Sequence, residues 1–175
     1  MTRNPAPIRG FTLIEVLIAL VILAFGLLAL ARVHANASLT EVEARQRTQA
    51  MALVAHMTSR IDLNRRHAAA YVGEYGGELQ ENCPALATQV ERDVCDWQNQ
   101  LAGVGTQDGA RNIGAPMAAM GCIVSTEPNV YVVAVSWLGL VETGAPTGPC
   151  GSGNFANEAT RRTFSSVVQI ATLGN

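Results

Sequence analysis

The sequence predicts an α+β fold in which one long N-terminal helix packs on a small head built around an antiparallel β-sheet. Residues 11–31 form an apolar run, and a helical hydrophobic period continues to residue 70 without proline. Three later segments, residues 121–126, 130–138 and 163–172, are rich in β-branched and aromatic residues. We therefore expect an antiparallel meander packed on the apolar stripe of the helix.

Length and charge limit the possible functions. The 175 residues suffice for one domain plus an appendage, which leaves no room for a second, catalytic domain. The formal net charge is -2, and the 12 basic residues are all arginines scattered along the chain. Because no basic run is present, we expect no direct nucleic-acid partner.

The first ten residues differ from the run that follows them. They carry Arg3 and Arg9, no acid and two prolines, which oppose a simple extension of the helix. The next 21 residues or so contain one charge, Glu15, and a helix of that length spans roughly 30 Å, the thickness of a bilayer core. A secretory signal is cut behind a shorter apolar core, whereas here the small residue Gly10 precedes the run. A cut after Gly10 would leave the apolar helix on the mature protein as an anchor.

The arginines also predict an orientation. Arg3 and Arg9 lie on one flank of the apolar run, and the positive-inside rule places that flank in the cytoplasm. The chain after Ala31 is then expected in the periplasm or beyond.

That compartment favours disulfide bonds between the four cysteines, none of which forms a CxxC pair. Of the three possible connectivities we favour Cys83 with Cys95 and Cys122 with Cys150, since each closes the smaller loop. A redox or metal role for these cysteines is the less favoured alternative.

Glu15 requires a separate explanation, because a carboxylate inside an apolar span costs several kcal/mol unless it is paired. One interpretation is that Glu15 lies close enough to the membrane face to reach headgroups or water. The other is a partner charge: a cut before Phe11 would create an α-amine suited to pair with Glu15 of an adjacent copy.

The hexapeptide from Gly10 to Glu15 (GFTLIE), followed by an unbroken apolar helix, resembles the class III signal of type IV pilins and of type II secretion pseudopilins. This resemblance implies a type IV pilin-like fold, cleavage after Gly10 by a prepilin peptidase and N-methylation of Phe11. It also implies that Glu15 pairs with the Phe11 amine of a neighbouring subunit. Residues 16–33 further resemble the minor pilins of the PilV type, the type IV pilus modification proteins.

The resemblance to PilV implies a structural role in the initiation or tip complex of a type IV pilus, and through it in twitching motility, adhesion and DNA uptake. The implied partners are prepilin peptidase, other minor pilins, the major pilin, the pilus assembly platform and inner-membrane lipid. The implied location is the bacterial inner membrane, with a single pass and a periplasmic head, and then the pilus fibre at the cell surface. A minor pseudopilin of a type II secretion system and a membrane-tethered adhesin module are the alternatives.

The chain is expected to divide into a leader (1–10), a transmembrane or filament-core helix (11–31), an amphipathic helix (32–70) and a globular head (71–175). The stripe of the amphipathic helix falls within about 120° of arc and comprises Leu39, Val42, Ala50, Leu53, Val54, Met57 and Ile61. The charged residues along the same stretch are expected to face solvent.

Within the head we expect a short helix around residues 93–101 with Trp97 in the core, and glycine-rich loops over residues 103–116 and 141–162. Pro128 and Asn129 suit a tight turn between two of the strands.

No catalytic motif, dinucleotide fingerprint, phosphate-binding loop or EF-hand is present. His34, His56 and His67 are spaced too far apart along one helix to share a metal ion, so we expect them on the surface. The sequence predicts a protein that is not an enzyme and that has no cofactor or metal site.

Overall fold

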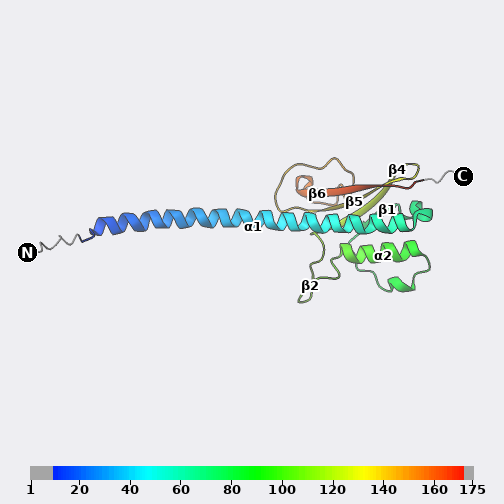
Figure 1. The fold of residues 1–175 in the computed structure, drawn as a ribbon, viewed down its shortest axis with the longest axis horizontal. Coiled ribbons are helices and arrows are strands. Elements are labelled where there is room, and N and C mark those ends of the chain that lie inside the picture. The colour runs from blue at the N-terminus through cyan, green and yellow to red at the C-terminus, as the bar shows by residue number, and fades with distance from the viewer. Residues whose placement is uncertain (1–9, 172–175) are drawn as a thin grey trace, which may run out of the picture. The chain divides into compact units, whose positions relative to one another are not determined.

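The computed structural model describes residues 10–171 and confirms the predicted α+β fold, a long N-terminal helix packed on a small antiparallel sheet (Figure 1). The chain divides into two compact units, Met1–Glu41 and Val42–Asn175. Helix α1 (Leu13–Leu63) contributes residues to both units. The part of α1 after residue 41 therefore belongs to the same unit as the sheet.

Helix α1 ends at Leu63, seven residues before the predicted end of the amphipathic helix at residue 70. A 3-10 helix, η1 (Arg65–Tyr71), follows it. Asn64 causes the break, since its backbone leaves helical geometry at φ -108 and ψ 35 and its side-chain amide donates a hydrogen bond to the Tyr71 hydroxyl at 3.0 Å. Asparagine is prone to such local bonds, which compete with the helix ladder.

The head sheet has the strand order β1-β4-β5-β6, and every neighbouring pair is antiparallel. Strands β4 (Met120–Glu127), β5 (Val130–Leu138) and β6 (Arg161–Gln169) lie where the sequence predicts strands. Asn129, at φ 64, forms the turn between β4 and β5, as expected. Strand β1 (Gly73–Gly76) is an addition to the expected sheet, since glycines such as Gly73 and Gly76 are more typical of a loop.

Two other parts of the head also differ from expectation. Within the predicted loop 103–116, β2 (Gln107–Asp108) and β3 (Arg111–Asn112) form a small hairpin. Helix α2 (Gln89–Leu101) begins four residues earlier than expected, because Thr88 and Glu91 form a capping box. The Glu91 N–H donates to Thr88 Oγ1 at 3.1 Å, and the Thr88 N–H donates to Glu91 Oε2 at 2.9 Å. Two short 3-10 helices, η2 (Cys83–Ala85) and η3 (Glu158–Thr160), complete the head.

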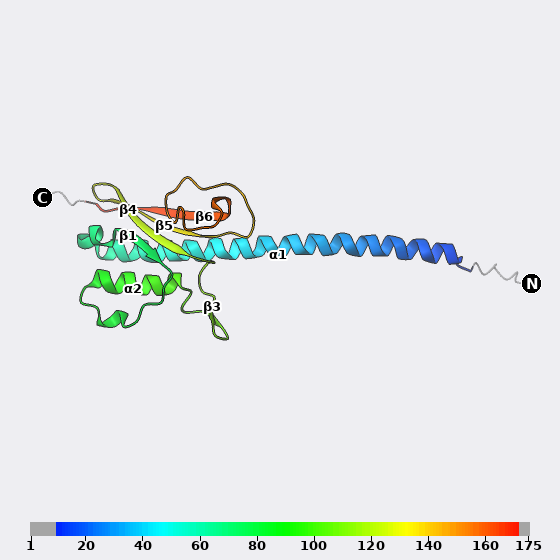
Figure 2. The ribbon, with the colours of Figure 1, turned by 180° about the vertical axis from the view of Figure 1, so that it is seen from behind.

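The head core lies between the last part of α1, α2 and one face of the sheet. Figure 2 shows α2 beside this part of α1. The predicted stripe is buried from Ala50 to Ile61, whereas Leu39 and Val42 are exposed. Trp97 is fully buried, as expected, and its indole N–H donates to the Leu53 carbonyl at 3.0 Å. This bond satisfies the one polar group of the largest core side chain.

Candidate processing and assembly site

Thr12 fixes the start of helix α1. Its Oγ1 accepts a hydrogen bond from the Glu15 N–H at 3.3 Å, and its carbonyl accepts from the N–H groups of Glu15 and Val16 at 3.1 and 3.3 Å. Thr12 thus serves as the N-cap. Glu15 lies in the first turn, where a carboxylate stabilises the helix by its interaction with the positive end of the helix dipole. The proposed cut between residues 10 and 11 lies just outside the helix.

No contact within the described chain requires glycine at position 10. Gly10 is exposed, its backbone is outside the positive-φ region, and a Cβ added there would meet nothing within 4 Å. Phe11 is 84% exposed. A requirement for a small residue at this junction would therefore have to come from a molecule that binds the chain.

The segment from Phe11 to Val33 exposes large apolar side chains on all sides of the helix. They are Phe11, Leu13, Ile14, Val16, Leu17, Ile18, Leu20, Val21, Ile22, Leu23, Phe25, Leu27, Leu28, Leu30 and Val33. Helix α1 is long and apolar enough to cross a membrane, and no other described part of the chain buries its most apolar 18-residue stretch. A helix that is apolar on all sides requires a membrane or other helices around it. This arrangement suggests membrane anchoring.

Gly10, Phe11 and Glu15 lie together at the start of α1, with Glu15 one turn beyond Phe11. The Glu15 side chain is exposed, and within residues 10–171 its carboxylate has no ion-pair partner. Arg3 and Arg9 lie outside the described residues, as does the rest of the leader 1–9.

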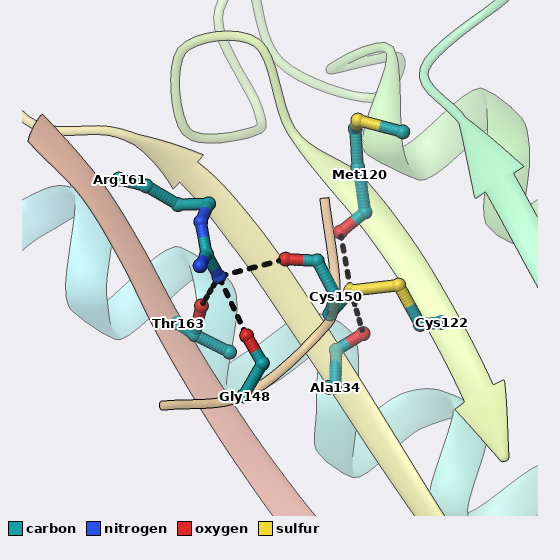
Figure 3. The surroundings of a disulfide bond; sticks show 7 residues. All are labelled: Met120, Cys122, Ala134, Gly148, Cys150, Arg161 and Thr163. Atoms are coloured by element: carbon teal, nitrogen blue, oxygen red, sulfur yellow. Dashed lines mark hydrogen bonds between the residues drawn. A yellow bond between two sulfur atoms is a disulfide. The ribbon is translucent and has the colours of Figure 1, made fainter. Parts of the chain in front are cut away.

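Two disulfide bonds clamp the head, and both have the favoured pairing. Cys83 bonds Cys95 with a Cα separation of 5.5 Å, which ties η2 to α2. Cys122 of β4 bonds Cys150 of the loop 139–160 with a Cα separation of 5.7 Å. Figure 3 shows the Cys150 segment lying over β4 and β5.

Arg161 holds the same loop in place, and the sequence analysis assigned it no role. It is 3% exposed, and its Nη1 donates to the carbonyls of Gly148 and Cys150 at 2.8 and 3.0 Å (Figure 3). Its Nε donates to Glu158 Oε2 at 2.6 Å. The hydrogen bond from the Gly153 N–H lowers the pKa of Glu158, and the hydrogen bond from the Arg161 side chain lowers it further. Arg161, which was expected within the loop 141–162, is the first residue of β6 and supports the disulfide-bearing loop.

Asp93 forms a second buried polar cluster that the sequence analysis missed. It is 1% exposed, and its Oδ1 accepts from Arg60 Nη1 at 2.5 Å and from Gln89 Nε2 at 2.7 Å. Its Oδ2 accepts from the Tyr71 hydroxyl at 2.6 Å. Burial, with the Asp93 hydrogen bond, raises the pKa of Tyr71 to about 12. The cluster joins α1, η1 and α2.

This cluster corrects two expectations about exposure. Arg60 was expected to face solvent, but it is half-buried against Asp93. His56 was expected on the surface, but it is half-buried and accepts a hydrogen bond from Arg60 Nε at 3.3 Å. Among residues 10–171, no group of three or more His, Cys, Asp or Glu side chains could hold a metal ion.

Comparison with known proteins gives one match. Residues 6–31 match the family model of the prokaryotic N-terminal methylation motif. No curated protein and no solved structure gives a significant match to the chain. The motif covers the Gly10–Phe11 peptide, Glu15 and most of the apolar part of α1, and it supports a type IV pilin-like or pseudopilin family for this chain.

Proposed function

We propose that this chain is a minor pilin of the PilV type that acts in the initiation or tip complex of a type IV pilus. The matched motif supports the broader class, a pilin-like or pseudopilin-like protein of pilus or secretion assembly. The observation that carries this proposal is the junction itself: the exposed Gly10-Phe11 peptide lies just before the capped start of α1, whose segment up to Val33 is apolar on all sides. The two disulfides and a sheet head are consistent with a folded periplasmic domain.

Processing is the first step of this proposal. A prepilin peptidase cuts between Gly10 and Phe11, and the new amine of Phe11 is methylated. Among residues 10–171 no contact requires glycine at position 10, and this supports recognition of Gly10 by an enzyme. The apolar helix stays on the mature chain and anchors it in the inner membrane, with the head in the periplasm.

Assembly is the second step. In a bundle of staggered helices, the Glu15 carboxylate of one subunit pairs with the Phe11 amine of its neighbour. The exposed Glu15 side chain leaves room for that pair, and burial among apolar helices would make an unpaired carboxylate costly. The pair thus favours one stagger over others.

Substitution at Gly10 tests the processing step. Gly10→Leu is expected to leave an uncut precursor in the membrane, as resolved by gel mobility and the mass of the N-terminal peptide. Gly26→Leu is the matched control, because Gly26 also has open space around it and lies beyond the proposed cut. Mature-length Gly10→Leu protein would contradict the assigned junction.

Substitution at Glu15 tests the assembly step separately. Glu15→Ala is expected to be cut normally but to be absent from sheared filaments. Glu81→Ala, which removes an exposed carboxylate from the head, should enter filaments normally. Normal entry of Glu15→Ala would refute the pairing role.

The same motif also fits a minor pseudopilin of a type II secretion system. Deletion of the gene distinguishes the two systems. The proposed pilus role predicts that the deletion strain loses surface pili and twitching but still secretes proteins. Loss of protein secretion with intact pili and twitching would favour the pseudopilin.

A further inference from the structure

We propose that the free edge of β6 is a docking site for an extended segment of another protein chain, which would add a fifth strand to the head sheet. The site consists of the edge from Thr163 to Gln169 and the groove between this edge and α1, which we name the β6 groove. It is built only from residues of the second compact unit, Val42–Asn175, and does not depend on the proposed filament role.

The register of the sheet shows which backbone groups are free. Strand β6 is the last strand of the sheet, and among the described residues it pairs only with β5. The Ile170 N–H donates to the Asn129 carbonyl at 2.8 Å, so the even-numbered residues of β6 are the ones that bond to β5. The N–H and C=O groups of Thr163, Ser165, Val167 and Gln169 therefore point to the free edge.

The β6 groove lies beside these groups and has a volume of about 620 Å³. Its lining comprises Met51, Val54, Ala55, Thr58, Ser59 and Asp62 of α1 and residues 164 and 166–169 of β6. Ala55 and Ser59 are small, which leaves space between helix and strand. From residue 51 to residue 62 the helix rises about 16 Å, which matches about five residues of a strand.

The edge lacks the features that usually prevent strand addition. Thr163 to Gln169 contains no charge and no proline, whereas natural edge strands are short, charged or covered. The preceding Arg161 and Arg162 are occupied by the loop 139–160. The opposite edge strand, β1, has only four residues and includes Glu74. Of the two edge strands in the part of the sheet that the structure describes, β6 is therefore the one with a long uncharged edge.

These features specify the occupant. A row of alternating backbone donors and acceptors is complementary to an extended backbone, as in β-strand addition. Val54, Phe164 and Val168 give the groove an apolar lining, and Thr58 Oγ1 in it is buried without a hydrogen-bond partner among the described residues. The fitting segment is about five residues long and uncharged, with small or apolar side chains at alternate positions.

A second copy of β6 is a poorer occupant. Phe164, Ser166 and Val168 share the sheet face that packs on α1 of their own chain. In a pair of β6 strands, these side chains of the second copy would stay packed on the α1 of that copy, so they would not fill the groove. We therefore assign the site to a segment of a different protein.

The test uses the full-length protein in the membranes of the producing cells. A benzophenone amino acid at Ser59 is the photo-cross-linking probe, and the captured residue is mapped by mass spectrometry. Val167→Pro removes an outward N–H without removing a bond to β5, whereas Val167→Thr keeps both the N–H and the β-branched shape. We expect at least a tenfold loss of the adduct for Val167→Pro and less than a twofold change for Val167→Thr.

A second pair of variants tests the groove without altering the strand. Ala55→Trp fills the groove from the helix, whereas Ala52→Trp places the same side chain at an exposed position that does not line it. Only Ala55→Trp should reduce the adduct tenfold. Adducts that persist in both Val167→Pro and Ala55→Trp would overturn the proposal, as would capture within a helix or in β6 of a second copy. Cleavage at Gly10 is scored in the same samples, so failure of docking and failure of processing are distinguishable.

Discussion

The Tyr71 hydroxyl donates a hydrogen bond to Asp93 Oδ2 at 2.6 Å, and this contact fixes the end of η1 against α2. Arg60 of α1 binds the other oxygen of the same carboxylate. One buried side chain thus joins three helical elements at the end of the head where α1 stops. This end is held by a polar cluster as well as by the apolar core.

Asp93→Asn is expected to destabilise the head by about 2 to 3 kcal/mol, because it removes the charge that Arg60 pairs with in a buried position. Urea unfolding of the full chain in detergent, followed by tryptophan fluorescence, measures the change. Asp96→Asn is the control: Asp96 is 45% exposed and lies 3.9 Å from Arg60, so its loss should cost below about 1 kcal/mol. Equal effects of the two variants would contradict the assigned role of Asp93.

His56 makes the stability of the head depend on pH. Burial is the main cause that lowers the pKa of His56 from its ordinary 6.5, and the positive charge of Arg60 is the second cause. The negative charges of Asp93 and Asp96 oppose this shift. The unfolded chain therefore binds this proton more readily, so stability is full above pH 6.5 and falls as the pH drops below it. Thermal unfolding at pH values on both sides of 6.5 should show this loss, and His56→Gln should reduce it. His67→Gln, at an exposed site, should leave the loss unchanged.

Arg161→Lys is expected to loosen the loop that carries Cys150. Lysine keeps the charge but lacks the planar fork that reaches the carbonyls of Gly148 and Cys150 as well as Glu158. We expect the free energy of unfolding to fall by about 2 kcal/mol and subtilisin to cleave faster within residues 139–160. Arg111→Lys, on exposed β3, should change neither measurement. Unchanged cleavage of Arg161→Lys would show that the disulfide alone holds the loop.

Gly121→Ala tests the close packing of β4 on α2. A Cβ at this position would overlap the Trp97 ring and lie 3.0 Å from Leu101 Cδ1. Over-packing of this kind costs about 1 to 3 kcal/mol, whereas Gly144→Ala adds a methyl group in open space and should change stability by less than about 0.5 kcal/mol. The difference between the two unfolding midpoints measures the effect, and equal midpoints would contradict it.

The parts of the fold that follow from local patterns were predictable. Helix α1 and strands β4, β5 and β6 have the hydrophobic period and residue types of their classes, and Trp97 is large enough to mark the core. Strand β1 was not predictable, because its glycines are typical of a loop and only pairing with β4 makes it a strand. The end of α1 at Leu63 depends on a bond between Asn64 and Tyr71, which no helical period contains.

The junction of the candidate site was also readable from the sequence, since Gly10, Phe11 and Glu15 are close in the chain. The capping role of Thr12 could have been found, because Thr12 precedes Glu15 by three residues, which is a known helix-start spacing. Asp93 and Arg161 could not be assigned, because a charged residue in a sequence gives no sign of a distant partner. Their roles depend on tertiary contacts across 33 and 11 residues.

The mass of the N-terminal peptide of the protein isolated from the membranes of the producing cells tests the central claim most directly. The isolated protein is expected to begin at Phe11, with a methyl group on its amine and the whole apolar helix retained. A chain that still begins at Met1, or one cut behind residue 31 so that the apolar helix is lost, would contradict it.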